Sequence, residues 1–121
     1  MAKFMIVDDS IFQRKTLGKM ILQMGGEVVA EASNGREAVE QYPDYRPDLV
    51  LMDLVMPEME GIEAVERIMD IDKNAKIVVV SSIGYDEIID KAISLGAKQF
   101  ISKPVNFSHA ANVIKTVLEE I

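Results

Sequence analysis

The sequence contains no cysteine, so it has neither a disulfide framework nor a thiolate site. This absence fits a cytoplasmic protein. No apolar run approaches the roughly 20 residues of a membrane-spanning helix, so we expect no membrane insertion. The first ten residues, MAKFMIVDDS, lack the small-residue cleavage region of a signal peptide.

Clusters of positive charge are also missing. The 13 lysines and arginines are outnumbered by 20 acidic residues, giving a formal net charge of -7. Such a chain is poorly suited to the phosphate backbone of nucleic acid, and we expect no nucleic-acid partner. A divalent cation or a basic protein surface is easier to accommodate, although acidity that serves only solubility is the simpler interpretation.

What the chain does have is a regular alternation of short apolar runs and helical patterns. Its 121 residues, 49% of them hydrophobic, predict one globular domain covering residues 1–121. Five strand–helix units in succession predict a doubly wound, flavodoxin-like α/β fold, with a five-stranded parallel sheet and helices on both faces. The expected strands are residues 3–7, 27–32, 48–53, 76–81 and 98–102. Ser10 with Gln13 and Asn34 with Glu37 are spaced like capping boxes and predict two helix starts.

Polar residues stand where these strands end. Asp8 and Asp9 follow the first strand, Asp53 ends the third, Ser81 ends the fourth and Lys103 follows the fifth. A doubly wound sheet binds ligands beyond the carboxyl ends of its strands, at a topological switch point. We therefore expect these five side chains to line one crevice.

The chemistry of this set indicates phosphoryl transfer. Converging carboxylates raise one another's pKa unless a cation lies among them. Mg²⁺ prefers oxygen ligands and keeps waters for phosphate oxygens, so Asp8, Asp9 and Asp53 would suit it. Aspartate is an established phosphoryl-accepting nucleophile, which makes Asp53 the predicted carrier. Lys103 would pair with Asp53 in the empty site and with a phosphoryl oxygen in the occupied one, and Ser81 would donate its hydroxyl.

Each of these residues also has a simpler interpretation. Asp9 or Ser10 can merely cap the first helix, a surface lysine is usually solvated, and serine often ends a strand. The combination at matching strand ends is what favours a site. The Lys103-Pro104 bond can be cis, which would fix the direction of the lysine.

With these residues in this order, the chain resembles the receiver domain of two-component response regulators. The resemblance covers essentially the whole chain. Its motifs are Asp8-Asp9, Asp53 within LMDLVMPEMEG, Ser81 after IVVV and Lys103-Pro104 after GAKQFIS.

The resemblance implies a mechanism and a ligand set. A partner histidine kinase would donate the phosphoryl group of its phosphohistidine to Asp53. Mg²⁺ would be bound by Asp9, by Asp53 and by the main-chain carbonyl of Val55, with Asp8 helping. Such a domain is a phosphoacceptor and not a conventional turnover enzyme.

The resemblance also implies a switch. Ser81 would move toward the phosphoryl group and Phe100 would then turn inward, although a simple core aromatic is the alternative for Phe100. The output face would be formed by the fourth helix, the fifth strand and the fifth helix, with Gly84, Asp86, Ile89 and Val113 on or near it. Overall similarity, including ASNGREAVEQY, is greatest to stand-alone chemotaxis regulators, which carry signals from a CheA-like kinase to the flagellar motor switch. A phosphorelay intermediate and the receiver of a transcription factor remain alternatives.

Two positions depart from a generic receiver. Val55 lies two residues after Asp53, and Ile83 lies two residues after Ser81. Neither side chain can orient an attacking water, so we expect slow loss of phosphate. Replacing Val55 by Asn and Ile83 by Glu should shorten the lifetime of the phosphoprotein.

Two other classes of protein fit the sequence less well. A phosphatase of the haloacid dehalogenase type needs a second acid two residues after its nucleophile, and the candidate positions hold Ser10, Ile11 and Val55. A flavodoxin-like nucleotide binder needs a Gly/Ser/Thr-rich loop after the first strand, where this chain has acids. The single histidine, His109, is expected to be a surface residue of the last helix.

Overall fold

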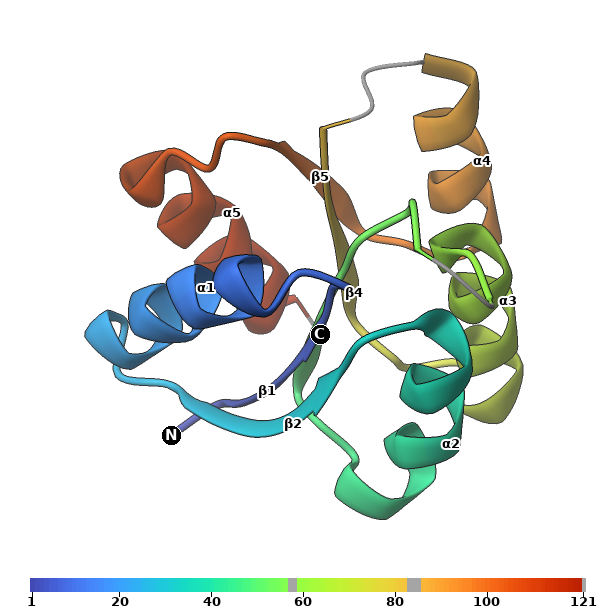
Figure 1. Ribbon diagram of the computed structural model, residues 1–121, viewed down its shortest axis with the longest axis horizontal. Helices are drawn as coiled ribbons and strands as arrows, with labels where there is room; N and C mark the ends of the chain where they lie inside the picture. Colours follow the sequence, from blue (N-terminus) through green and yellow to red (C-terminus); the bar gives the residue numbers. More distant parts are fainter. Residues whose placement is uncertain (57–58, 83–85, 121) are drawn as a thin grey trace.

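The computed structural model describes residues 1–56, 59–82 and 86–120. Its strands are β1 (Lys3–Val7), β2 (Glu27–Ala32), β3 (Leu49–Met52), β4 (Ile77–Ser81) and β5 (Gln99–Ser102). Its helices are α1 (Ile11–Gln23), α2 (Gly35–Tyr45), α3 (Gly61–Ile71), α4 (Asp86–Leu95) and α5 (Phe107–Glu119). The strands pair in parallel in the order β2-β1-β3-β4-β5 (Figure 1). The predicted doubly wound fold is confirmed.

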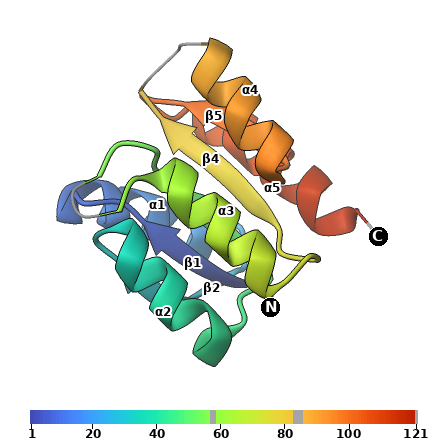
Figure 2. The ribbon, with the colours of Figure 1, turned by 90° about the vertical axis from the view of Figure 1, so that its right-hand side faces the viewer.

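The helices form two layers, one on each face of the sheet. α1 and α5 cover one face, and α2, α3 and α4 cover the other (Figures 1 and 2). Successive residues of a strand point to opposite faces. Phe4 and Ile6 of β1 accordingly belong to the hydrophobic cluster under α1 and α5, whereas Met5 and Val7 belong to the cluster under the other three helices. All four residues are buried, which explains why the strand is an unbroken apolar run.

The predicted strand boundaries are correct to within one residue. The first two strands have the predicted bounds, and the other three each begin one residue later than predicted. Those excluded residues are Asp48, Lys76 and Lys98, polar side chains that precede the buried segments. β3 also ends one residue early, so Asp53 follows the strand directly.

Both predicted helix starts are correct. The hydrogen bonds differ from those of a capping box, in which the side chain three residues into the helix accepts from the N–H of the cap residue. The side-chain oxygen of Ser10 accepts from the Gln13 N–H at 3.2 Å, and that of Asn34 accepts from the Glu37 N–H at 2.8 Å. The Glu37 carboxylate accepts from the Ser33 N–H, one residue before the cap. Within the described residues, no helix is both long enough and apolar enough to cross a membrane.

Candidate functional site

The pairing of β1 with β3 places two of the predicted acids side by side. Val7 and Met52, the last residues of these strands, are partners in the parallel ladder. The next residue on each strand is an aspartate. The Asp53 N–H donates to the Val7 carbonyl at 2.9 Å, and the Asp8 N–H donates to the carbonyl of Ala32 on β2 at 3.0 Å. The backbone positions of both acids are therefore set by the sheet.

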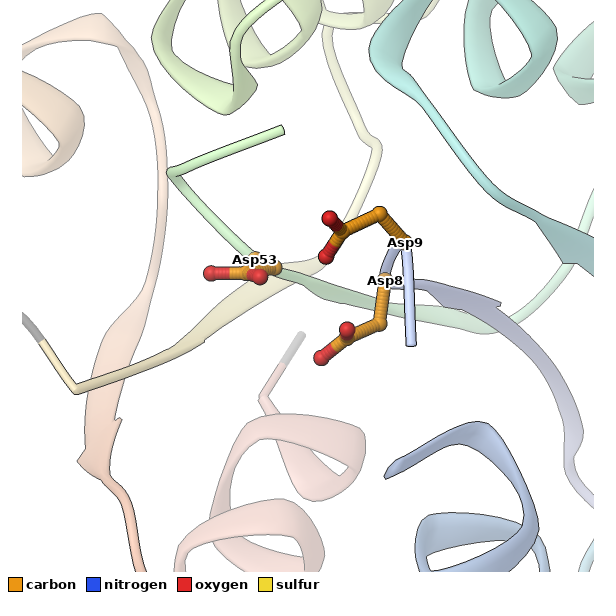
Figure 3. Close-up of side chains that lie close together, drawn as sticks. All are labelled: Asp8, Asp9 and Asp53. Carbon is orange, nitrogen blue, oxygen red and sulfur yellow. The ribbon is translucent and has the colours of Figure 1, made fainter. Parts of the chain in front are cut away.

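Three carboxylates converge at this edge of the sheet. Asp8, Asp9 and Asp53 each offer an oxygen atom, and these atoms lie within 4.8 Å of one another (Figure 3). Asp8 and Asp53 are 1% and 7% exposed, whereas Asp9 is exposed. The cluster therefore has a buried floor and one acid on the solvent side. The prediction that these three acids come together at one edge of the sheet is confirmed, and the crevice expected to hold all five side chains stays a prediction.

Lys103 adds one positive charge to the cluster. Its Nζ donates to Asp8 Oδ2 at 2.7 Å and lies 3.5 Å from Asp53 Oδ2. Its backbone N–H donates to the Ser81 carbonyl at 3.0 Å, and the Lys103-Pro104 peptide bond is cis. The sequence predicted a pair with Asp53. The structure contains that pair, but Asp8 is the closer partner of the lysine.

Burial and neighbouring charges together raise the pKa of Asp53. Burial of the carboxylate is the largest cause, and the Asp8 charge acts in the same direction. The Lys103 charge opposes both, as do hydrogen bonds from the N–H groups of Val55 and Leu54. The Val55 N–H donates to Asp53 Oδ1 at 3.3 Å. The single positive charge of Lys103 therefore does not fully offset the cost of burying the ionised Asp53 carboxylate beside Asp8.

This donor set fits a hard divalent cation. Three carboxylates and one ammonium leave a formal excess of negative charge, and the oxygens are close enough to share one ion. Mg²⁺ takes oxygen ligands and needs room for waters, which the exposed Asp9 side provides. Val55 borders the site through its N–H, and the residue is 52% exposed. The use of its carbonyl as a ligand stays a prediction.

Ser81 and Phe100 lie on the two strands beyond β3. Ser81 is the last residue of β4, is 1% exposed, and is paired in the ladder with Ser102 of β5. Phe100 is half-buried and packs against the hydrophobic cluster that underlies α2, α3 and α4. The roles of both residues in switching remain predictions.

The geometry agrees with what comparison with known proteins shows. A family model described as "Response regulator receiver domain" matches residues 4–115. The chain belongs to the response regulator receiver family. The receiver is 48% identical over 115 residues to the chemotaxis protein CheY of Thermotoga maritima, a match that covers 95% of this chain and 96% of that protein. It is 43% identical over 116 residues to CheY of Bacillus subtilis, covering 96% and 97% of the two chains.

Solved structures agree with this assignment. A chain in a crystal structure of the CheX-CheY-BeF3-Mg²⁺ complex from Borrelia burgdorferi matches with a TM-score of 0.95 and 32% identity. That match covers 98% of this chain and 90% of the other. The response regulator domain of Thermotoga maritima CheB matches with a TM-score of 0.85 and 32% identity, covering 97% and 93%. The receiver is thus a CheY-like domain of two-component signalling.

The residues predicted for the output face of the receiver are placed only in part. Ile89 on α4 and Val113 on α5 are partly buried, and Asp86 is the first residue of α4. Gly84 lies outside the described residues, as does Ile83, the second position expected to affect phosphate loss. His109 is exposed on α5, as predicted.

Sequence reasoning missed one residue that contacts the loop carrying Asp8 and Asp9. Arg14, on α1, donates from Nη1 to the main-chain carbonyl of Asp8 at 2.6 Å and from Nε to Glu31 at 3.0 Å. The signal was its position one helical turn after Ser10, because side chains four residues apart lie on one face of a helix.

Two glycines that approach the chain after β3 closely were also missed. A Cβ at Gly61 would collide with the main-chain carbonyl of Asp53, and one at Gly35 would collide with the main-chain carbonyl of Met59. The Gly61 N–H donates to the Leu54 carbonyl at 3.1 Å. The start of α3 therefore packs directly against the backbone that carries Asp53, and only glycine permits this approach.

Proposed function

We propose that this receiver accepts a phosphoryl group on the carboxylate of Asp53, from the phosphohistidine of a CheA-like histidine kinase, in a Mg²⁺-dependent reaction. The observation that carries the proposal is the convergence of Asp53 with Asp8, Asp9 and Lys103 at one edge of the sheet. The likeness to CheY proteins supports the choice of a chemotaxis kinase as donor. Like its relatives, the protein would act in the cytoplasm.

In the transfer step, an Asp53 carboxylate oxygen attacks the phosphorus atom. A P–O bond forms, the P–N bond to the donor imidazole breaks, and the electron pair returns to that nitrogen. The carboxylate attacks in its ionised form, so this chain supplies no base. Lys103 lies 3.5 Å from the acceptor carboxylate and is placed to exchange that contact for a phosphoryl oxygen. The Ser81 hydroxyl would donate to another oxygen from the adjoining strand.

The acidic cluster would hold the metal. We assign Asp9, Asp53 and the Val55 carbonyl as ligands, with Asp8 assisting while it keeps its hydrogen bond to Lys103. A bound Mg²⁺ supplies positive charge opposite the phosphoryl oxygens as charge develops on them. Asp9 is the exposed member of the cluster and gives the ion its route from solvent.

The output would pass through the face formed by α4, β5 and α5. Donation by the Ser81 hydroxyl to phosphoryl oxygens favours one position of its loop, and Phe100 would follow by turning further into the core. Because Phe100 has no hydroxyl, it would act through packing. The proposed target is the flagellar motor switch. The support is the likeness to CheY proteins, one of which forms a complex with CheX in crystals that contain BeF3 and Mg²⁺.

Incubation with acetyl phosphate, with and without Mg²⁺, followed by mass measurement tests the proposal. We expect a stable mass gain of one phosphoryl group that requires both the metal and Asp53. Asp53→Asn should remove the gain, whereas Asp90→Asn, the same change at an exposed position of α4, should preserve it. Labelling of Asp53→Asn at the wild-type rate would refute the assignment of the acceptor. Rapid release of inorganic phosphate from a generic phosphate ester would instead favour a phosphatase.

A further inference from the structure

Arg14 joins three parts of the receiver at a point just behind the acidic cluster. It lies on α1, and its side chain is only 15% exposed. Its guanidinium donates to the Asp8 main-chain carbonyl at 2.6 Å and to the carboxylate of Glu31, on β2, at 3.0 Å. The rigid guanidinium fork thus connects a helix, an edge strand and the loop that carries Asp8 and Asp9.

The contact with the Asp8 carbonyl restrains the orientation of the peptide group between Asp8 and Asp9. The Asp8 carbonyl and the Asp9 N–H belong to one planar peptide group, which also contains the Asp9 Cα. Fixing the direction of the carbonyl therefore fixes the direction in which the chain continues to Asp9. The rest of Asp8 is already held, because its N–H donates to Ala32 and its Oδ1 accepts from the Ser10 N–H at 2.9 Å.

Asp9 depends on this backbone restraint more than the other two acids do. Asp8 and Asp53 are buried and contact Lys103, whereas Asp9 is exposed. An exposed side chain receives little restraint from packing, so its average position follows that of its Cα. The Ser10 N–H bond to Asp8 Oδ1 restrains the chain after Asp9, and the peptide plane that Arg14 holds restrains it before Asp9, so both help keep the Asp9 carboxylate near the other two.

We propose that Arg14 is a positioning residue for Mg²⁺ binding: by holding the Asp8–Asp9 peptide, it preorganises the Asp9 carboxylate for the ion. This inference rests on the proposed Mg²⁺ site. The contact of Arg14 with Asp8 is to the main-chain carbonyl, so Arg14 would not itself be a ligand of the ion. Its effect therefore falls on metal affinity and leaves the reacting atoms of Asp53 in place.

The sign of the effect separates positioning from simple electrostatics. Arg14 is a cation near a cation site, so removing its charge would strengthen Mg²⁺ binding if charge alone mattered. Loss of positioning acts in the opposite direction. Residues that orient metal ligands typically contribute a factor of about 10 to 100 in metal affinity, and we expect Arg14→Ala to weaken Mg²⁺ binding about tenfold.

The experiment is calorimetric titration of the purified protein with MgCl₂, together with phosphorylation by acetyl phosphate over a range of Mg²⁺ concentrations. Lys15→Ala is the matched control, because it removes the same charge from an exposed position next along the same helix. We expect Lys15→Ala to bind Mg²⁺ as tightly as wild type or slightly more tightly. Arg14→Ala should need about tenfold more Mg²⁺ for half-maximal phosphorylation, yet reach nearly the wild-type rate at saturation.

Arg14→Lys keeps the charge and decides the question if Arg14→Ala fails to fold. A single ammonium cannot replace the planar fork, so the Mg²⁺ affinity of Arg14→Lys should be lower than that of wild type. Where Arg14→Ala also folds, the affinity of Arg14→Lys should lie between those of wild type and Arg14→Ala. Wild-type affinity in a folded Arg14→Ala or in Arg14→Lys would overturn the inference. So would equal weakening by Lys15→Ala. If the wild-type protein itself does not bind Mg²⁺, the proposed function fails, and with it the basis of this inference.

Discussion

Replacing the proposed phosphoacceptor by its neutral isostere should stabilise the metal-free protein. Asp53→Asn removes a buried carboxylate that lies within 4.8 Å of two others. The amide oxygen can still accept from the Val55 N–H, which donates to Asp53 Oδ1 at 3.3 Å. Lys103 keeps its shorter contact with Asp8, at 2.7 Å. Few favourable contacts are therefore lost.

The magnitude follows from the distances. With an effective dielectric constant of about 20, the Lys103–Asp53 attraction at 3.5 Å amounts to about 5 kcal/mol. The Asp8–Asp53 repulsion at up to 4.8 Å amounts to about 3.5 kcal/mol or more. The net attraction, at most about 1.5 kcal/mol, does not offset the desolvation of a buried carboxylate, which costs several kcal/mol. We therefore expect Asp53→Asn to raise the free energy of unfolding by about 1–2 kcal/mol.

The gain should depend on pH and on metal. The pKa of Asp53 is raised above its usual 3.8, chiefly by burial, so the folded state holds this proton to a higher pH than the unfolded state does. Ionisation of Asp53 thus costs stability as pH rises through the folded pKa. The advantage of Asp53→Asn should be small near pH 3.8 and should grow as the pH rises through the folded pKa of Asp53. Mg²⁺ should reduce the stability advantage of Asp53→Asn, because the ion stabilises the wild type more than a variant that lacks one ligand.

Urea unfolding in the presence of EDTA, at acidic and at neutral pH, measures this difference. Asp90→Asn is the control, because it also reduces the net negative charge of -7 by one, at an exposed position. We expect little change from Asp90→Asn. A metal-free Asp53→Asn protein less stable than wild type at neutral pH would refute the reasoning, as would a gain equal to that of the control.

Three further predictions concern a buried tyrosine, the glycine that packs against Asp53, and Val55. Tyr42→Phe removes a hydrogen bond of 2.8 Å from the buried hydroxyl to the Asp72 carboxylate, and urea unfolding should show a loss of about 1–2 kcal/mol; no loss would contradict this. Because burial raises the pKa of Tyr42, the wild type should also lose stability more steeply than the variant above about pH 10. Gly61→Ala would press a methyl group against the Asp53 carbonyl, so we expect a loss of about 2 kcal/mol and slower phosphorylation by acetyl phosphate, and normal values for both would contradict it. Val55→Asn should shorten the lifetime of the phosphoprotein followed by mass, and an unchanged or longer lifetime would refute slow dephosphorylation as a property of this side chain.

The fold and the position of the acidic cluster could be predicted because both follow from local patterns. Buried parallel strands are continuous apolar runs, and the polar residue that ends each run marks the edge of the sheet. Asp8 and Asp53 were therefore placed together without knowledge of the strand order. The predicted strand boundaries were wrong by one residue at Asp48, Lys76 and Lys98. The sequence does not show whether a polar residue beside an apolar run takes part in the hydrogen bonding of the sheet.

The remaining features of the site depend on tertiary geometry. Lys103 was expected to pair with Asp53, but its side chain lies closer to Asp8, and no spacing in the sequence distinguishes the two. Arg14 donates to the main-chain carbonyl of Asp8. Because every residue has such a carbonyl, the sequence does not indicate which one the arginine contacts. The need for glycine at position 61 arises from a backbone that is adjacent only in the folded protein.

The order of the strands places the proposed acceptor and the proposed switch in parts of the sheet that differ in rigidity. Asp53 follows β3, whose four residues are buried and which is bonded on both sides, whereas Phe100 belongs to β5, a margin with a single neighbour. Segments with fewer bonds and more exposure deform at lower free-energy cost. Substitutions in and around β5 can therefore change the output surface, and with it the protein that binds there. The buried backbone that positions Asp53 would be left undisturbed.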